Sequence, residues 1–204
     1  MSKHKKFGLA LIFLACHGAA FSGAYVGIAG GEGWSNATSK LYDFYDYGHY
    51  GLTRKDNNRP AYALYLGDTL SERDALELSY TNFGQYKITS PTFGDSTRAS
   101  AFSFRWVHQF PINEKSGVDS HLGAAWMKEQ YHCLSECAGL PDTTTNRLVG
   151  VAGVGVYWGI SPAVRIRAGV DYYNGGRFTI RDQGADYQLS ANYLVAALGV
   201  EYHF

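Results

Sequence analysis

Residues 163–173 read AVRIRAGVDYY, and apolar side chains occupy every second position of this stretch, from Val164 to Tyr172. Arginine, glycine and aspartate fill the positions between them. An alternation with a period of two places the apolar residues on one face of an extended chain and the polar residues on the other. The stretch therefore predicts a β-strand with one apolar and one polar face.

The same alternation recurs along the rest of the chain and predicts eight strands of roughly 9 to 13 residues. Two glycine-rich segments, 24–34 and 147–158, do not show which face is apolar. The remaining strands are PAYALYLGD (60–68), ALELSYTN (75–82), RASAFSFRWVHQF (98–110), DSHLGAAWMK (119–128) and the C-terminal residues 194–204.

The connections alternate between long and short. Four long polar loops joined to three short turns are what an eight-stranded up-and-down barrel requires when both termini lie on the short-turn side. We therefore predict an all-β fold, an eight-stranded antiparallel transmembrane β-barrel. The predicted long loops are 35–59, 88–97, 130–146 and 174–187, and the predicted short turns are 69–74, 111–118 and 159–162.

A soluble sandwich or lipocalin-like barrel would show similar strands, but its apolar face would point inward. Here large aromatic residues gather on the apolar face near the strand ends, as in the interfacial girdles of membrane proteins. A helical multi-span protein is excluded, because the one helix-forming apolar run covers only residues 7–16. The aromatic residues in question are Tyr62, Tyr80, Trp106, Trp126, Tyr172, Tyr202 and Phe204.

Residues 1–22 have the features of a secretory signal peptide: three lysines, an apolar run and small residues suited to cleavage. We expect a cleaved signal, since the apolar run is too short for a retained anchor. Cleavage would leave a single barrel domain, 23–204, with 15 basic and 18 acidic residues. This mildly acidic balance gives no indication of nucleic-acid binding.

Two cysteines remain after the predicted cleavage, Cys133 and Cys137, in the sequence CLSEC. An even pair in an exported protein predicts a disulfide. A metal site would need further ligands at suitable spacing, and only His132 lies beside the pair. We predict no metal site and no cofactor.

The chain ends in phenylalanine, and Val200 and Tyr202 precede Phe204 at alternate positions. This predicts a final strand whose lipid-facing side runs to the last residue. The ending also resembles the C-terminal signature by which the outer-membrane assembly machinery recognises its clients. Together with a signal peptide, it predicts a protein of the Gram-negative outer membrane.

Four segments carry a family resemblance: AYVGIAGGEGW (24–34), ALELSYTNFGQYK (75–87), GVGVYWGISPAVRIRAGVDYY (153–173) and LGVEYHF (198–204). They resemble strands of the transmembrane domain of outer-membrane protein A and of its small relatives, including opacity-type surface proteins. The resemblance implies contact with outer-membrane lipid, including lipopolysaccharide, and with the barrel-assembly machinery. It also implies that Arg167 takes part in an interior charge network.

Several charged residues fall on the inward face of the predicted barrel, where an unpaired charge is costly. Hairpin symmetry places Glu77 near Arg105, and Glu201 near Arg165 or Arg167. We interpret the set as a polar plug, and a gated ion path is the alternative. The predicted lumen charge network comprises Glu77, Arg105, Arg165, Arg167, Asp171 and Glu201.

The longest predicted loop contains LYDFYDYGHYGL (41–52), which is rich in aromatic residues. Exposed aromatic side chains suit contact with another surface, although they could instead pack on one another. We predict a structural or adhesive role towards a host or neighbouring-cell surface. The alternatives are a narrow low-conductance pore and an outer-leaflet lipid-modifying enzyme. The predicted loop contact residues are Tyr42, Phe44, Tyr45, Tyr47 and Tyr50.

The enzyme alternative needs a catalytic pair such as serine with histidine. Ser120 and His121 are adjacent, but they fall at the predicted periplasmic start of a strand, away from the outer leaflet. His121 also lies on the lumen side, and no flanking residues resemble the deacylase motif. We therefore predict no catalytic residue and a non-enzymatic protein.

Overall fold

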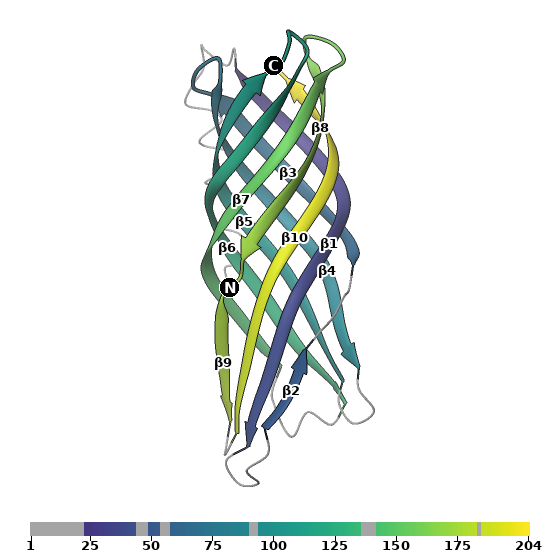
Figure 1. Cartoon of the computed structure of the whole chain (residues 1–204), viewed down its shortest axis with the longest axis vertical. Helices are drawn as coiled ribbons and strands as arrows, with labels where there is room; N and C mark the ends of the chain where they lie inside the picture. Colours follow the sequence, from purple (N-terminus) through teal and green to yellow (C-terminus); the bar gives the residue numbers. More distant parts are fainter. Residues whose placement is uncertain (1–22, 44–48, 54–57, 90–93, 136–141, 183–184) are drawn as a thin grey trace, which may run out of the picture.

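The computed structural model describes residues 23–43, 49–53, 58–89, 94–135, 142–182 and 185–204, and all of its regular elements are β-strands (Figure 1). No helix in this part of the chain has the length and hydrophobicity needed to cross a membrane. The strands are β1 (Ala24–Asp43), β2 (His49–Thr53), β3 (Arg59–Thr69), β4 (Asp74–Thr89), β5 (Gly94–Pro111), β6 (Ser116–Ser135), β7 (Thr143–Gly159), β8 (Val164–Asn174), β9 (Arg177–Asp182) and β10 (Ala185–His203).

Eight of these strands form a closed antiparallel barrel, which confirms the predicted fold class. Strands β1 and β3 to β8 pair in chain order, β8 pairs with β10, and β10 pairs with β1 to close the barrel. Two shorter strands lie at one end only, where β2 pairs with β1 and β9 pairs with β10. The C-terminus lies at the opposite, short-turn end (Figure 1), and so does the start of β1, since the Phe204 N–H donates to the Ala24 carbonyl at 3.0 Å.

The three short turns share one local chemistry. Each has four residues, 70–73, 112–115 and 160–163, and a serine or asparagine at the second position. Ser71 Oγ accepts hydrogen bonds from the backbone N–H groups of Arg73 and Asp74. Asn113 Oδ1 accepts two bonds in the same way, and Ser161 Oγ accepts one. Such side chains stabilise tight turns by replacing backbone partners, and they fix the strand register at this end.

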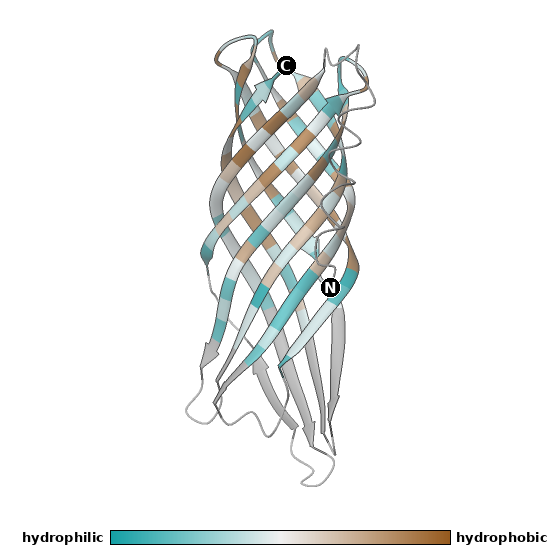
Figure 2. Cartoon of the chain, turned by 180° about the vertical axis from the view of Figure 1, so that it is seen from behind, coloured by the Kyte–Doolittle hydropathy of each residue, from teal (hydrophilic) through white to brown (hydrophobic). Residues whose placement is uncertain are grey.

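The outer face of the barrel carries an apolar belt, as the period-two alternation predicts. Figure 2 shows hydrophobic residues concentrated on the half of the barrel nearer the C-terminus, with hydrophilic residues beyond them. Rows of exposed aromatic residues border the belt. The upper aromatic row, so named because it lies towards the β2 and β9 end that Figure 1 draws at the bottom, is Tyr62, Tyr80, Phe102, Trp126 and Tyr172. The lower aromatic row, towards the short turns, is Phe110, Trp158, Tyr202 and Phe204.

The barrel interior is packed with side chains. Small residues there face large ones across the strands: Tyr25 lies opposite Gly67, and Tyr65 lies opposite Gly27. A β-carbon at Gly27 would lie 2.3 Å from the Tyr65 ring carbon Cζ, so the glycine provides the space that the ring occupies. The sequence indicated an interior of small and charged residues, whereas the structure adds buried aromatic rings. These are Tyr25, Tyr65, Phe83, Tyr86, Tyr131, Tyr157, Tyr173 and Tyr193.

The structure corrects all four predicted long loops, because each of these ranges contains strand residues. The range 35–59 contains the end of β1, all of β2 and the start of β3, and the other three ranges also contain strand residues. The longest barrel strands consequently have 20 residues rather than at most 13. An antiparallel ladder continues in water as readily as in lipid once polar side chains cover its outer face, so apolar alternation marks only the belt and not the whole strand.

Candidate functional site

An interior ion network occupies the barrel within the belt, and its first centre is Arg105 on β5. Arg105 forms an ion pair with Glu77, its register partner on β4. Its second guanidinium nitrogen donates to Asp171 Oδ2 on β8 at 2.6 Å. Both Arg105 and Glu77 are buried, so the pair satisfies charges that would be costly alone.

Arg167 on β8 is the second centre and contacts three carboxylates. Its nitrogen atoms lie 2.7 Å from Glu77, 3.2 Å from Asp119 and 3.2 Å from Glu201. Glu201 lies opposite Arg165 in the ladder but forms its ion pair with Arg167. One guanidinium group therefore connects β4, β6 and β10 to β8 across the lumen.

His121 lies between two carboxylates. Its Nδ1 is 2.9 Å from Asp171 Oδ1, and its Nε2 contacts Asp119. The predicted network did not include Asp119 or His121. Alternation along β6 places both on the inward face, but hairpin symmetry pairs residues only across a single hairpin.

Arg165, a predicted network member, lies apart from these contacts. Its guanidinium carbon lies 4.4 Å from the centre of the Tyr157 ring, and its Nη1 is 3.5 Å from Gln109 Oε1. The other five predicted members are brought together with Asp119 and His121. Such a network cross-links strands and fills the lumen with matched charge, which suits a plug. Within the described ranges, no cluster of histidine, cysteine, aspartate and glutamate has a metal-binding arrangement.

A second buried cluster lies towards the hairpin end. Glu129 on β6 accepts a 2.6 Å hydrogen bond from the Tyr193 hydroxyl and forms an ion pair with Arg147. The Tyr193 ring packs against Phe83, with ring centres 4.9 Å apart. The sequence did not predict this cluster because Glu129 and Arg147 directly flank residues 130–146, which were predicted to form a loop.

Beyond the upper aromatic row the strands form what we call the hairpin extension, and there the closed barrel becomes two four-stranded sheets. One sheet has the order β2-β1-β10-β9. The other consists of β4 to β7, because the ladders of β3 and β8 stop at Tyr62↔Asn82 and Gly150↔Asn174. In the described chain, β2, β9 and residues 85–89 and 143–149 therefore each have a ladder partner on one side only.

The predicted loop contact residues fall partly in this extension. Tyr42 is in β1 and Tyr50 is in β2, and their backbones are one register step apart. Phe44, Tyr45 and Tyr47 lie outside the described residues. Cys133 is in β6 opposite Asp95, but Cys137 also lies outside the described residues, so the disulfide stays a prediction.

Other predicted residues lie on the outer face or divide between the two faces. Val200, Tyr202 and Phe204 point outward, and 68% of Phe204 is exposed at the end of the lower aromatic row. Ser120 is partly buried, whereas His121 is buried in the interior network. The two side chains thus diverge, which does not favour a serine–histidine catalytic pair.

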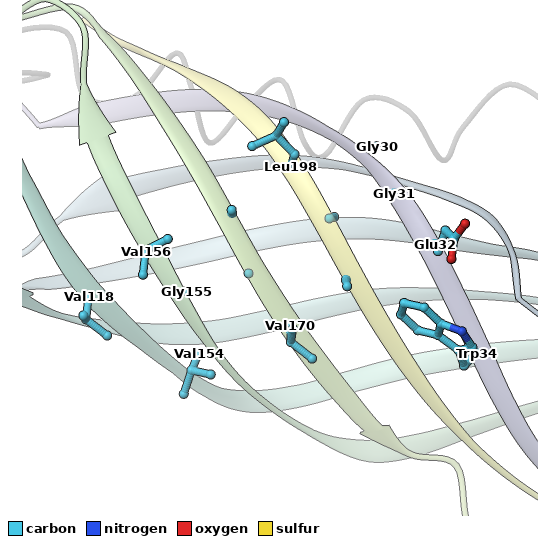
Figure 3. A pocket seen from close by; sticks show the side chains of 14 residues that line it. Gly30, Gly31, Glu32, Trp34, Val118, Val154, Gly155, Val156, Val170 and Leu198 are labelled. Carbon is cyan, nitrogen blue, oxygen red and sulfur yellow. The ribbon is translucent and has the colours of Figure 1, made fainter.

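A shallow depression crosses the outer surface of β6, β7, β8, β10 and β1 (Figure 3). Small residues such as Gly30 and Ala196 lower the surface, and exposed apolar residues such as Leu198 border it. Glu32 lies at its border on β1 as an exposed carboxylate, 3.4 Å from Asn58 Nδ2. This side of the barrel therefore carries an outward negative charge next to the apolar belt.

Comparisons with known proteins agree with this geometry. A profile of the OmpA-like transmembrane domain matches residues 20–204. The chain is similar to neisserial surface protein A, at 17% identity, with 90% of this chain and 98% of that protein covered and a TM-score of 0.51. It is also similar to OprG of Pseudomonas aeruginosa, at 10% identity, 90% and 97% coverage and a TM-score of 0.61. A search of curated proteins gave no match.

Proposed function

The chain belongs to the OmpA-like transmembrane domain family, and from that premise we propose that it is a surface-attachment protein of the bacterial outer membrane. The barrel anchors the protein, and the hairpin extension contacts a host or neighbouring-cell surface. The short-turn end then faces the periplasm and the extension faces the cell exterior, since outer-membrane barrels have short periplasmic turns and long extracellular loops.

The observation that carries this proposal is the pair of four-stranded sheets above the belt. A strand with a ladder partner on one side only presents backbone N–H and C=O groups that can pair with another chain. An extended polypeptide segment can add to such an edge, with the backbone giving affinity and the side chains giving specificity. The aromatic residues between β1 and β2 would add contact area at low entropic cost.

The interior supports anchoring rather than transport. The ion network around Arg105 and Arg167 spans the lumen from β4 to β8, and buried tyrosine rings occupy the space on either side of it. A pore would require these groups to separate. Steady conductance of the purified barrel in a planar lipid bilayer would favour the pore alternative.

Attachment through an edge is tested on β9, whose register partners all lie in β10. In a strand at a sheet edge, successive N–H groups point alternately towards the paired strand and away from it. Of Thr179→Pro and Ile180→Pro, one therefore removes a free N–H, and the other removes a bond to β10. We expect the substitution that removes a free N–H to reduce binding of expressing bacteria to cultured epithelial cells while the barrel stays fully folded.

The substitution that removes a bond to β10 is the matched control, because it should loosen β9 locally without removing a free N–H. Heat-modifiable gel migration reports whether each variant forms the barrel. If wild-type producers bind cells no better than non-producers, the attachment role is wrong. If both proline variants bind like wild type, attachment does not use this edge.

A further inference from the structure

Two opposite sides of the barrel differ in the bulk of their outward side chains. Five large and exposed side chains cover the outer face of β5 and β6, and we call this surface the bulky wall. The small residues of the depression, Gly30, Ala168 and Ala196, lie on β1, β8 and β10 (Figure 3). In the order of the closed barrel, β6 is four strands from β1 in either direction, so the two surfaces face opposite ways. The bulky wall comprises Phe102, Phe104, Trp106, Leu122 and Trp126.

Each of these surfaces also has an exposed charge at its upper end. Glu32 on β1 lies one outward pair beyond the ladder pair that contains Tyr62. Lys128 on β6 lies one outward pair beyond the ladder pair that contains Trp126. Both charges are exposed, and both therefore lie one ladder pair beyond a member of the upper aromatic row. Copies of one barrel in one bilayer share their orientation and depth, so Glu32 of one copy can reach Lys128 of another.

Neither charge has an ionic partner among the residues that the structure describes. Glu32 accepts a hydrogen bond from Asn58 Nδ2 at 3.4 Å, which leaves the carboxylate charge in place. Ser100 and Asn146 lie opposite Lys128 on the two neighbouring strands, and both are neutral. The effective dielectric constant is lower at the border of the hydrocarbon layer than in bulk water. An ion pair formed there is correspondingly stronger.

The difference in bulk matters because lipid tails cover an apolar surface as well as another protein does. Association within a bilayer therefore depends on close packing and polar contacts, and small residues on one partner let the other approach closely. The bulky wall of one copy set against the depression of another meets this condition. The ion pair at the upper end adds the polar contact and selects which two surfaces meet.

We propose that the depression is occupied by a second copy of this chain. The bulky wall of one barrel packs into the depression of the next, and Lys128 of the first forms an ion pair with Glu32 of the second. The contact joins two different surfaces on opposite sides of the barrel, so it does not close on itself. It produces open rows in the membrane plane rather than symmetric dimers. This inference does not rest on the proposed surface attachment.

The test measures association of full-length barrels in vesicles of phosphatidylcholine, which has no net charge. Energy transfer between donor-labelled and acceptor-labelled copies is followed over a series of protein-to-lipid ratios. Glu32→Lys and Lys128→Glu each place like charges in the contact, so each should weaken association at least about tenfold. The double variant restores an opposite pair with its signs exchanged, and it should associate within about twofold of wild type.

A mixture of the two single variants provides a second measurement. Copies with Glu32→Lys should associate with copies with Lys128→Glu about as tightly as wild-type copies associate, because every contact in an alternating row then joins opposite charges. A symmetric contact between two depressions would instead leave Lys128→Glu with the association of wild type. That result would overturn the proposal.

The packing of the contact is tested by Ala196→Phe, which fills the depression and should abolish association. Leu64→Phe is the matched control, because it adds an aromatic ring to the outer face of β3, outside both surfaces. Equal effects of these two variants would contradict the packing.

Lys115→Glu is the control for charge, because it reverses an exposed charge on a short turn and should leave association unchanged. Heat-modifiable gel migration shows whether each variant forms the barrel. The proposal is wrong if wild-type barrels show only the energy transfer of random encounters. It is also wrong if the double variant does not restore association, or if Lys115→Glu weakens association as much as Lys128→Glu does.

Discussion

Arg167 shows why charged residues inside a narrow barrel act as a set. Its guanidinium group contacts carboxylates from β4, β6 and β10. Arg167 therefore keeps two carboxylate partners when any one of the three is removed. The sequence predicted Glu77 and Arg105 as neighbours because hairpin symmetry fixes pairs on adjacent strands. It could not place Asp119 beside Arg167, because that contact crosses the lumen between strands that are not paired.

At this scale we predict that Arg105→Ala destabilises the barrel. The substitution leaves Glu77 and Asp171 each without one buried partner, and breaking a buried pair costs about 3–5 kcal/mol. The free energy of unfolding, measured by urea titration in lipid vesicles, should fall by an amount in that range.

The matched control is Arg165→Ala, because Arg165 on β8 is also an inward-facing arginine. Arg165 packs on the Tyr157 ring and is partly exposed, so its loss should cost about 1 kcal/mol or less. Equal losses for Arg105→Ala and Arg165→Ala would contradict the role given to the network.

At the scale of the element, β4 contains a bulge that period-two reasoning could not anticipate. The β4–β5 register shifts between Asn82 and Gln85, and Gly84 has a φ of 81°. This bulge directs both Phe83 and Tyr86 into the interior, although strict alternation would separate them. The alternation predicted every strand within the belt, but it carried no information beyond the bulge, where the outer face becomes polar.

We predict that Gly84→Ala weakens the upper half of β4. An L-residue in the left-handed region costs about 1–2 kcal/mol, and the added β-carbon would lie 2.9 Å from Pro60 O. The unfolding free energy should drop by at least this amount. Gly150→Ala is the control, because its β-carbon would meet no atom within 4 Å, and a similar loss there would show that any added methyl is harmful.

At the scale of the whole molecule, the barrel divides into three levels with different chemistry. The short turns use serine and asparagine caps, the belt alternates lipid-facing apolar residues with interior charges and rings, and the extension has polar outer faces and sheet edges. The sequence identified the short turns, the apolar alternation of the belt and most of its interior charges, since these are local signals, but it did not identify the buried rings. The edges of the extension depend on where β3 and β8 stop pairing, which is not a local property.

We predict that deletion of Phe204 reduces assembly in cells without reducing stability. Phe204 ends the outward row of β10, its ring packs edge-on to Tyr202 at 5.2 Å, and the row resembles an assembly signature. The amount of heat-modifiable barrel in the outer membrane should fall several-fold. Unassisted folding into lipid vesicles should be unchanged.

Phe110→Ala is the matched control, because Phe110 belongs to the same lower aromatic row and is similarly exposed. It removes a comparable lipid contact from a strand in the middle of the chain. If both changes reduce assembly equally, the effect is lost lipid contact and the C-terminal row has no special role.

The seam between β1 and β10 joins the two ends of the domain, from Tyr25 opposite His203 to Asp43 opposite Ala185. Among the barrel strands, β1 is synthesised and exported first, and its partner β10 is last. Pairings between such distant segments form slowly, and a long unpaired strand is prone to aggregate while it waits. The architecture that gives the finished barrel its closed wall therefore makes the nascent chain dependent on escorts that shield its first strand until the last one arrives.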